Sequence, residues 1–168
     1  LPTEAQWERA AAWDGSKHWI YGFTSDTAVT DNTRANWRNA NASYVNPFNL
    51  TTPYVSPPGW FDGFHVSPNG SVQTVYSISP EGCYDMSGNL RELCHDWYME
   101  NWYTEGGPYQ VNPTGPPTST NVPPAKVLRG GGPADYYHVT RSARRANQAN
   151  DIQQSVVGFR VVRESDQL

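Results

Sequence analysis

The feature that most limits the fold is a long stretch, from Trp13 to Pro80, in which apolar residues recur at neither the helical period of 3.6 nor the strand period of 2. The stretch is rich in Asn, Pro, Gly and aromatic residues, which favour turns. Loops this long are uncommon in compact domains unless something else holds them, and a bound cation is one candidate. We therefore expect a loop-rich domain with little regular secondary structure.

Aromatic side chains have to fill much of the core. The chain has 7 Trp, 10 Tyr and 5 Phe among 168 residues, and only 17% of its residues are charged. This length is sufficient for one domain that buries a hydrophobic core without many disulfides or a structural metal. We expect residues 1–168 to form a single domain with an aromatic-rich core.

Three segments predict regular secondary structure. Thr3 precedes an acidic first turn and an alanine run, which predicts a short helix over about residues 3–12. Lys126–Arg129 and Val156–Val162 are typical of short strands, whereas the Pro-rich and Thr-rich segment Pro108–Pro124 is expected to be a surface loop. The fold class is therefore expected to be α+β.

Charge and composition exclude some partners. The net charge of −4 argues against a general binder of nucleic acid, which needs a cationic surface. No apolar run approaches the roughly 20 residues of a transmembrane helix. Asn41, Asn49 and Asn69 begin glycosylation tripeptides, although an Asn-rich chain also produces these by chance. We expect an extracellular or cell-surface location.

Short motifs occur in a distinctive order: LPTEAQWERAAA from Leu1, GCYDMSGNLRELCHDWY from Gly82, VLRGGG from Val127, RSARRAN from Arg141 and GFRVVR from Gly158. Their order and spacing resemble the formylglycine-generating-enzyme, or sulfatase-modifying-factor, family, which has a C-type-lectin-like fold. The resemblance covers residues 1–163. It implies that the chain represents the C-terminal part of the domain and that the usual N-terminal portion is missing.

The resemblance also implies structural calcium sites. One would use Asn89, with Glu92 as a further ligand, and a second would use Asn36 with Trp37 and the segment from Asp62 to Phe64. Calcium prefers carboxylate, amide and carbonyl oxygens, and an ion would help to order the long loop. The alternative is that these side chains only hydrogen-bond to the turns around them.

Catalysis is less well supported than binding. The oxidase of this family uses a cysteine pair after the RGG motif, but the window Gly132–Thr140 contains no sulfur. Cys83 and Cys94 lie in the GNLRELC scaffold motif, where a buried cysteine usually acts as a small hydrophobe. We expect the motif to be helical here, which places Glu92 and Asp96 one helical turn apart. This carboxylate pair is expected to have a structural role. The catalytic alternatives are an oxidase with a different cysteine and a fragment of an iron-dependent sulfoxide synthase.

The candidate binding segment is residues 132–157. The usual Ser-Trp after the two glycines is replaced by Gly132-Pro133, and adaptable recognition residues follow. The candidate ligand-binding residues are Asp135, Tyr136, Tyr137, His138, Arg144, Arg145, Asn147, Gln148 and Asn150.

One branch of this family consists of variable proteins that retroelements diversify in the same window, at adenine-containing codons. The substituted window resembles such a product, and ordinary drift in an inactive relative is the alternative. Both interpretations predict a ligand-binding domain with a protein or cell-surface partner. We expect Pro133–Gln154 to face solvent, with Tyr136, Tyr137, His138, Arg145 and Asn147 in contact with the ligand, and Arg141 and Arg160 to belong to the scaffold.

Overall fold

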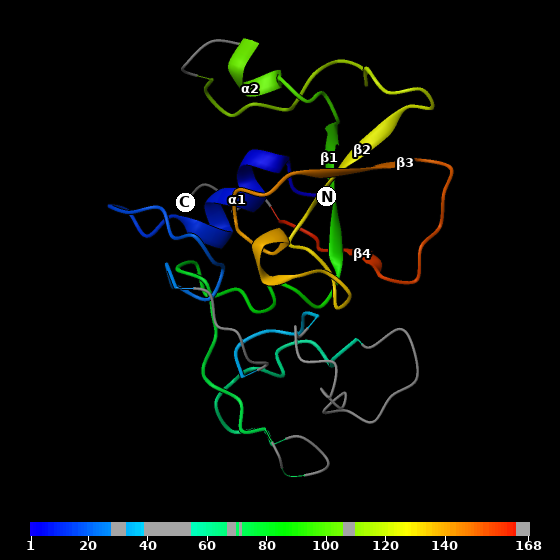
Figure 1. Ribbon diagram of the computed structural model, residues 1–168. Helices are drawn as coiled ribbons and strands as arrows, with labels where there is room; N and C mark the ends of the chain where they lie inside the picture. Colours follow the sequence, from blue (N-terminus) through cyan, green and yellow to red (C-terminus); the bar gives the residue numbers. More distant parts are fainter. Residues whose placement is uncertain (28–32, 39–54, 67–69, 71, 106–109, 164–168) are drawn as a thin grey trace.

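The computed structural model describes residues 1–27, 33–38, 55–66, 70, 72–105 and 110–163. Its elements in chain order are α1 (Glu4–Ala12), β1 (Arg91–Trp97), α2 (Trp102–Glu105), β2 (Ala125–Arg129), the 3-10 helix η1 (Tyr137–Val139), β3 (Ala146–Ala149) and β4 (Val157–Phe159). The strands form one sheet in the order β3-β2-β1-β4 (Figure 1). All neighbouring strands are antiparallel except β1 and β4, which are parallel.

Helix α1 confirms the expected helix over residues 3–12. Thr3 is its N-cap, and the side chains of Thr3 and Gln6 each accept a hydrogen bond from the other's backbone N–H, at 3.2 and 2.9 Å. This reciprocal capping satisfies N–H groups that a helix start leaves without partners. The helix buries Trp7, Ala11 and Ala12 in the core.

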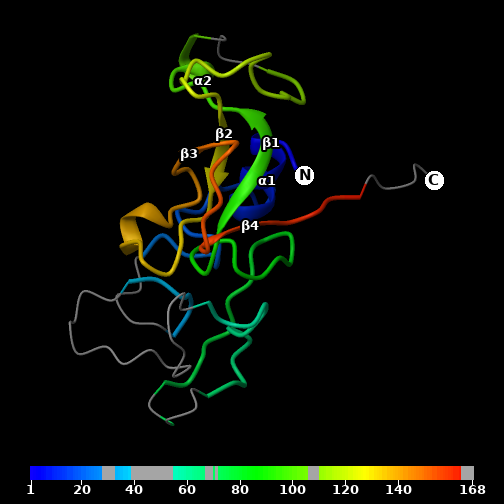
Figure 2. The same ribbon diagram turned by 90° about the vertical axis from the view of Figure 1, so that its right-hand side faces the viewer.

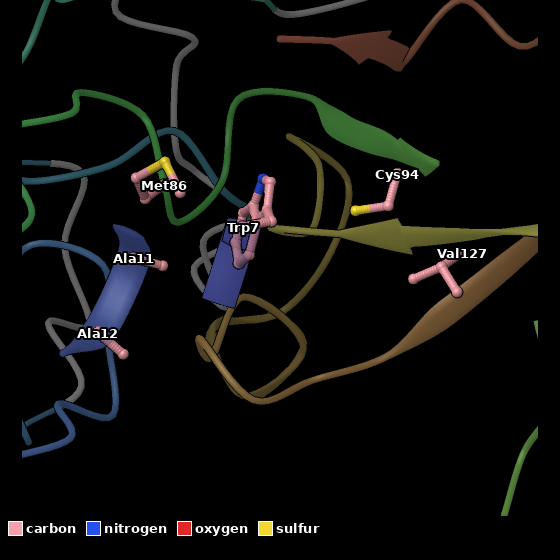
Figure 3. Packing of buried hydrophobic residues seen from close by; sticks show 6 residues of the cluster. All are labelled: Trp7, Ala11, Ala12, Met86, Cys94 and Val127. Carbon is pink, nitrogen blue, oxygen red and sulfur yellow. The ribbon is translucent and has the colours of Figure 1, made fainter. Parts of the chain in front are cut away.

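The main core is small and lies between α1 and the sheet. Trp7, Ala11, Ala12, Met86, Cys94 and Val127 pack together there (Figure 3). A second buried cluster consists of Tyr21, Phe23, Ala35 and Trp37, in which the Tyr21 and Phe23 rings stack 5.2 Å apart. Aromatic side chains thus carry a large part of the packing, as the composition predicts.

Strand β1 corrects the helical interpretation of Glu92 and Asp96. Glu92, Cys94 and Asp96 are buried, and the residues between them are more exposed. This alternation is the period of a strand, and positions four apart share a face in a strand as well as in a helix. The spacing of the two carboxylates was therefore compatible with either structure.

The loop-rich character of the chain is confirmed in the described residues. Those between Trp13 and Pro80 form turns and isolated strand pairings rather than helices or strands. They include residues 55–66 and 72–80, which lie at the end of the sheet away from α2 (Figures 1 and 2). Asn41, Asn49 and Asn69 lie outside the described residues.

The C-terminal elements differ in part from expectation. The strand at Lys126–Arg129 is confirmed as β2, while β4 is shorter than the expected Val156–Val162. Strand β3 and helix α2 were not predicted. Neither α-helix in the described part of the chain has the length or apolar character that crossing a bilayer would require.

Candidate ligand-binding surface

A buried ion network fixes the start of the candidate segment. Arg129, at the end of β2, is 2% exposed. Its guanidinium donates to Glu4 Oε1 at 2.7 Å, to Glu8 and to the carbonyl of Ser142. Because both carboxylates come from α1, this network ties the helix to β2 and to the RSARRAN motif.

Arg145 belongs to this network, which contradicts the expectation that its side chain faces solvent. Its guanidinium forms two hydrogen bonds with the carboxylate of Glu4, at 2.7 and 2.9 Å. It also donates to the carbonyls of Met99 and Glu100, and it lies over the rings of Tyr98 and Tyr103. These partners lie far from Arg145 in the sequence. The sequence alone therefore does not distinguish Arg145 from the adjacent Arg144, which is exposed.

Asp135 is also a scaffold residue in this structure. Its carboxylate accepts two hydrogen bonds from Arg91, at 2.8 and 2.6 Å, and one from the backbone N–H of Gly132 at 2.8 Å. Burial acts to raise the pKa of Asp135, but the bonds from Arg91 and Gly132 outweigh it and hold the pKa below its usual value. Asp135 therefore closes the loop after the glycines.

Strand β3 separates buried from exposed candidates in the second half of the segment. Gln148 is 8% exposed and its amide donates to the carbonyl of Ile152, which contradicts the expected solvent exposure. Asn147 is exposed, as expected, and its side chain accepts a hydrogen bond from Asn121 at 3.2 Å. Asn150 is exposed as well. The alternation of a strand thus removes Gln148 from the surface.

Tyr136, Tyr137 and His138 form an exposed aromatic cluster. Tyr136 and Tyr137 are 42% and 39% exposed, and His138 is exposed too. The ring of His138 stacks on Tyr136 at 5.9 Å and meets Tyr137 edge-on at 5.8 Å. The exposed aromatic cluster therefore packs on itself.

The backbone beneath the exposed aromatic cluster is well anchored. Thr140 is fully buried, and its hydroxyl donates to the carbonyl of Tyr137 at 2.9 Å. The carbonyl of Thr140 accepts a hydrogen bond from the buried Ser87 at 2.8 Å. A rigid turn thus presents the three rings, which lowers the entropy cost of binding.

Sequence reasoning missed Arg38 as a neighbour of this surface. Its guanidinium lies 5.0 Å from the centroid of the Tyr136 ring, and its backbone N–H donates to the carbonyl of Asp135 at 2.8 Å. Arg38 lies in the segment without a sequence period, which gives no signal for such a contact.

Asn89 and Glu92, which were expected to bind calcium, are not arranged to ligate an ion in this structure. Both oxygens of Glu92 accept hydrogen bonds from Arg160, and Oε2 also accepts one from the Trp7 indole. The side-chain oxygen of Asn89 accepts from the N–H and hydroxyl of Ser56. Their oxygens are thus engaged by protein donors, and Arg160 has the scaffold role expected of it.

The second calcium set lies in two separate described segments. Asn36 and Trp37 are buried, while Asp62 and Phe64 lie in a turn, with Phe64 87% exposed. The Asp62 carboxylate accepts from the N–H groups of Phe64 and His65, at 2.8 and 3.1 Å, and pairs with the His65 ring. The bond from the Phe64 N–H helps to lower the pKa of Asp62 to about 2. Calcium at this set stays a prediction.

The cysteines are free thiols in the scaffold. Cys94 is fully buried in the core cluster and Cys83 packs against that cluster. Burial raises the pKa of the Cys94 thiol. A protonated, buried thiol is a poor nucleophile and a poor metal ligand.

Comparison with known proteins places the whole chain in one family. The family of the sulfatase-modifying factor enzyme 1-like domain matches residues 1–165. A formylglycine-generating enzyme of Streptomyces coelicolor is 28% identical over 99% of this chain and 47% of its own length. The serine/threonine-protein kinase Pkn1 of Chlamydia trachomatis is 29% identical over 98% of this chain and 21% of its own length. The chain therefore spans about half or less of these relatives.

Solved structures share the fold. The variable protein 1 of Treponema denticola has a TM-score of 0.60 at 24% identity, covering 95% of this chain and 45% of its own. PvdO from Pseudomonas aeruginosa has a TM-score of 0.61 at 22% identity, covering 95% and 50%. These similarities confirm the loop-rich α+β, C-type-lectin-like fold. Since the family match extends over nearly every residue, the protein belongs to the sulfatase-modifying factor enzyme 1-like domain family.

Proposed function

We propose that this chain is a non-catalytic, lectin-like domain that binds a protein partner through the exposed aromatic cluster. The observation that carries the proposal is that His138 stacks on Tyr136 and meets Tyr137 edge-on at the surface, above an anchored turn. Aromatic side chains at the centre of a patch dominate the energy of protein interfaces.

The surroundings of the exposed aromatic cluster suit a recognition surface. Arg144, Asn147 and Asn150 are exposed in the same segment, and Arg38 lies over Tyr136. Arg38 supplies hydrogen-bond donors beside the aromatic centre, and the other three residues supply polar groups elsewhere in the segment. Asp135, Arg145 and Gln148 take no part in the proposed contact, because the scaffold engages them.

We further propose that the binding segment belongs to the retroelement-diversified branch of the family and that the domain acts at the cell exterior. The support is a fold shared with a protein named as variable, together with the substituted window after the glycines. A reverse transcriptase gene beside an adenine-substituted copy of this window would support the branch. Its absence from the surrounding genome would leave ordinary drift as the origin of the segment.

Oxidation of a sulfatase is the second candidate function, because relatives over this whole chain are formylglycine-generating enzymes. Copper loading followed by incubation with a sulfatase-derived cysteine peptide tests it. We expect no formylglycine product, since Cys94 is buried and the window Gly132–Thr140 has no cysteine. Turnover that Cys83→Ser or Cys94→Ser abolishes would contradict the non-catalytic proposal.

Site-specific crosslinking tests where the partner binds. A photoreactive phenylalanine would replace Tyr136 in one variant and Tyr76 in another, since Tyr76 is 57% exposed but lies outside the candidate segment. In cells that produce the protein, we expect a defined protein adduct from position 136 and none from position 76. Equal adducts from both positions, or none from position 136, would argue against this surface.

A further inference from the structure

A cleft of about 460 Å³ lies on the side of β1 away from the Arg91–Asp135 pair. Glu92 lines the cleft, and neighbouring residues in a strand point to opposite sides of the sheet. The cleft is therefore separate from the exposed aromatic cluster. Its volume falls in the range of pockets that hold small ligands.

Hydrogen bonds hold the walls of the cleft in place. The side chain of Asn89 accepts from the N–H of Ser56 at 2.8 Å and donates to the carbonyl of Ser56 at 3.1 Å. The carboxylate of Asp85 accepts from the N–H of Gly59 at 2.8 Å. These bonds fix the turn at Pro57–Trp60, one wall of the cleft, against the residues that precede β1, which makes the cleft preorganised.

The charged residues that line the cleft are the carboxylates of Asp85 and Glu92 and the guanidinium of Arg160, which leaves one excess negative charge. Glu92 and Arg160 neutralise each other through two hydrogen bonds. Asp85 uses one oxygen for Gly59, and no described residue donates a hydrogen bond to the other. Burial raises the pKa of Asp85, and the N–H of Gly59 and the charge of Arg160 offset this only in part.

Apolar groups line the same cleft. Phe159 is 67% exposed although it lines the cleft, and Pro58, Leu90 and Tyr84 line it as well. A carboxylate flanked by aromatic and aliphatic groups matches a cation at the end of an alkyl chain, because the stem contacts the apolar groups while the charge meets the carboxylate. We propose that the cleft binds an alkylammonium group, with Asp85 as its counter-ion and with Phe159 and Tyr84 beside its stem.

Titration with small amines, followed by NMR of the backbone amides, tests this proposal. Nα-acetyl-lysine methylamide and cadaverine carry the ammonium group of a protein lysine and of a free diamine, and the tighter binder would indicate which source the cleft favours. Saturable shifts are expected at residues 84–92 and 158–160. The norleucine analogue, which has a similar stem without the charge, is expected to bind about tenfold more weakly or less.

Asp85→Asn is the decisive variant. Asp85 has a φ of 59°, a conformation that Asn also tolerates, and the Asn side chain keeps an oxygen for the N–H of Gly59. We expect it to weaken amine binding about tenfold or more. The matched control is Asp26→Asn, which removes an exposed charge while it keeps an acceptor for the N–H of Ile20.

The control should bind the amines like the unchanged protein. Unchanged affinity in Asp85→Asn, equal binding of the norleucine analogue, or no saturable shift with either amine would each overturn the proposal. Calcium chloride that produces the same shifts and displaces both amines would overturn it too, because the cleft would then select for charge alone.

Discussion

Adjacent residues of the candidate segment have opposite roles. Arg144 is exposed, whereas Arg145 contacts Glu4, which lies 141 residues away in the chain. A single sequence shows that both are arginines but does not show which one meets a buried carboxylate. The same limit applies to Asp135, whose partner Arg91 lies 44 residues away. Whether a residue of the segment belongs to the scaffold or to the surface thus depends on long-range contacts, which the sequence does not show.

Replacement of the two arginines should separate these roles. Arg145→Ala leaves the carboxylate of Glu4 with fewer donors in a buried site, so we expect it to lower the free energy of unfolding by about 2–4 kcal/mol. Arg144→Ala should change it by no more than about 0.5 kcal/mol, as surface substitutions usually do. Urea unfolding of both variants measures the difference. Equal losses would mean that the Glu4 contacts do not support the fold.

At the level of elements, local sequence signals predicted helices and strands correctly, whereas spacings that suit both a helix and a strand did not. Thr3 and Gln6 mark the start of α1 by a capping pattern that needs no distant partner. The apolar run in β2 was equally clear. Glu92 and Asp96, by contrast, are four residues apart, which suits one face of a helix or of a strand. Strand β3 was missed because its sequence, Ala-Asn-Gln-Ala, contains no residue that favours strands.

The turn after β2 requires glycine for reasons that can be tested. Gly131 has a φ of 71°, and an added Cβ would lie 2.9 Å from the side chain of Thr140. Gly82 has a φ of 79° with nothing within 4 Å of an added Cβ. We expect Gly82→Ala to cost about 1 kcal/mol from backbone strain alone. Gly131→Ala should cost about 1–3 kcal/mol more, because it also displaces Thr140 beneath the exposed aromatic cluster.

Thermal or urea unfolding of the two alanine variants gives this comparison. Similar losses at both positions would mean that Thr140 moves without cost, and the turn would then not be a rigid support for the exposed aromatic cluster.

At the scale of the whole molecule, the fold and family were predictable because ordered motifs span the chain. The calcium site at Asn36 and Asp62 was inferred from the resemblance and stays a prediction. If Asn36 and Asp62 hold an ion, excess chelator should lower the melting temperature, because an ion that binds only the native state stabilises it. Asp62→Asn, which keeps an acceptor for the turn, should remove this response. An unchanged melting curve in chelator would contradict the calcium prediction.

The most direct test of the central claim combines stability and binding in one variant. Tyr136→Ala, Tyr137→Ala and His138→Ala together remove the exposed aromatic cluster and leave Thr140 and the ion network in place. We expect a cost of no more than about 1 kcal/mol per site, as at other surface positions, with loss of affinity for the partner captured by crosslinking at position 136. Global unfolding of this variant, or unchanged affinity for that partner, would contradict the claim that the cluster exists for recognition.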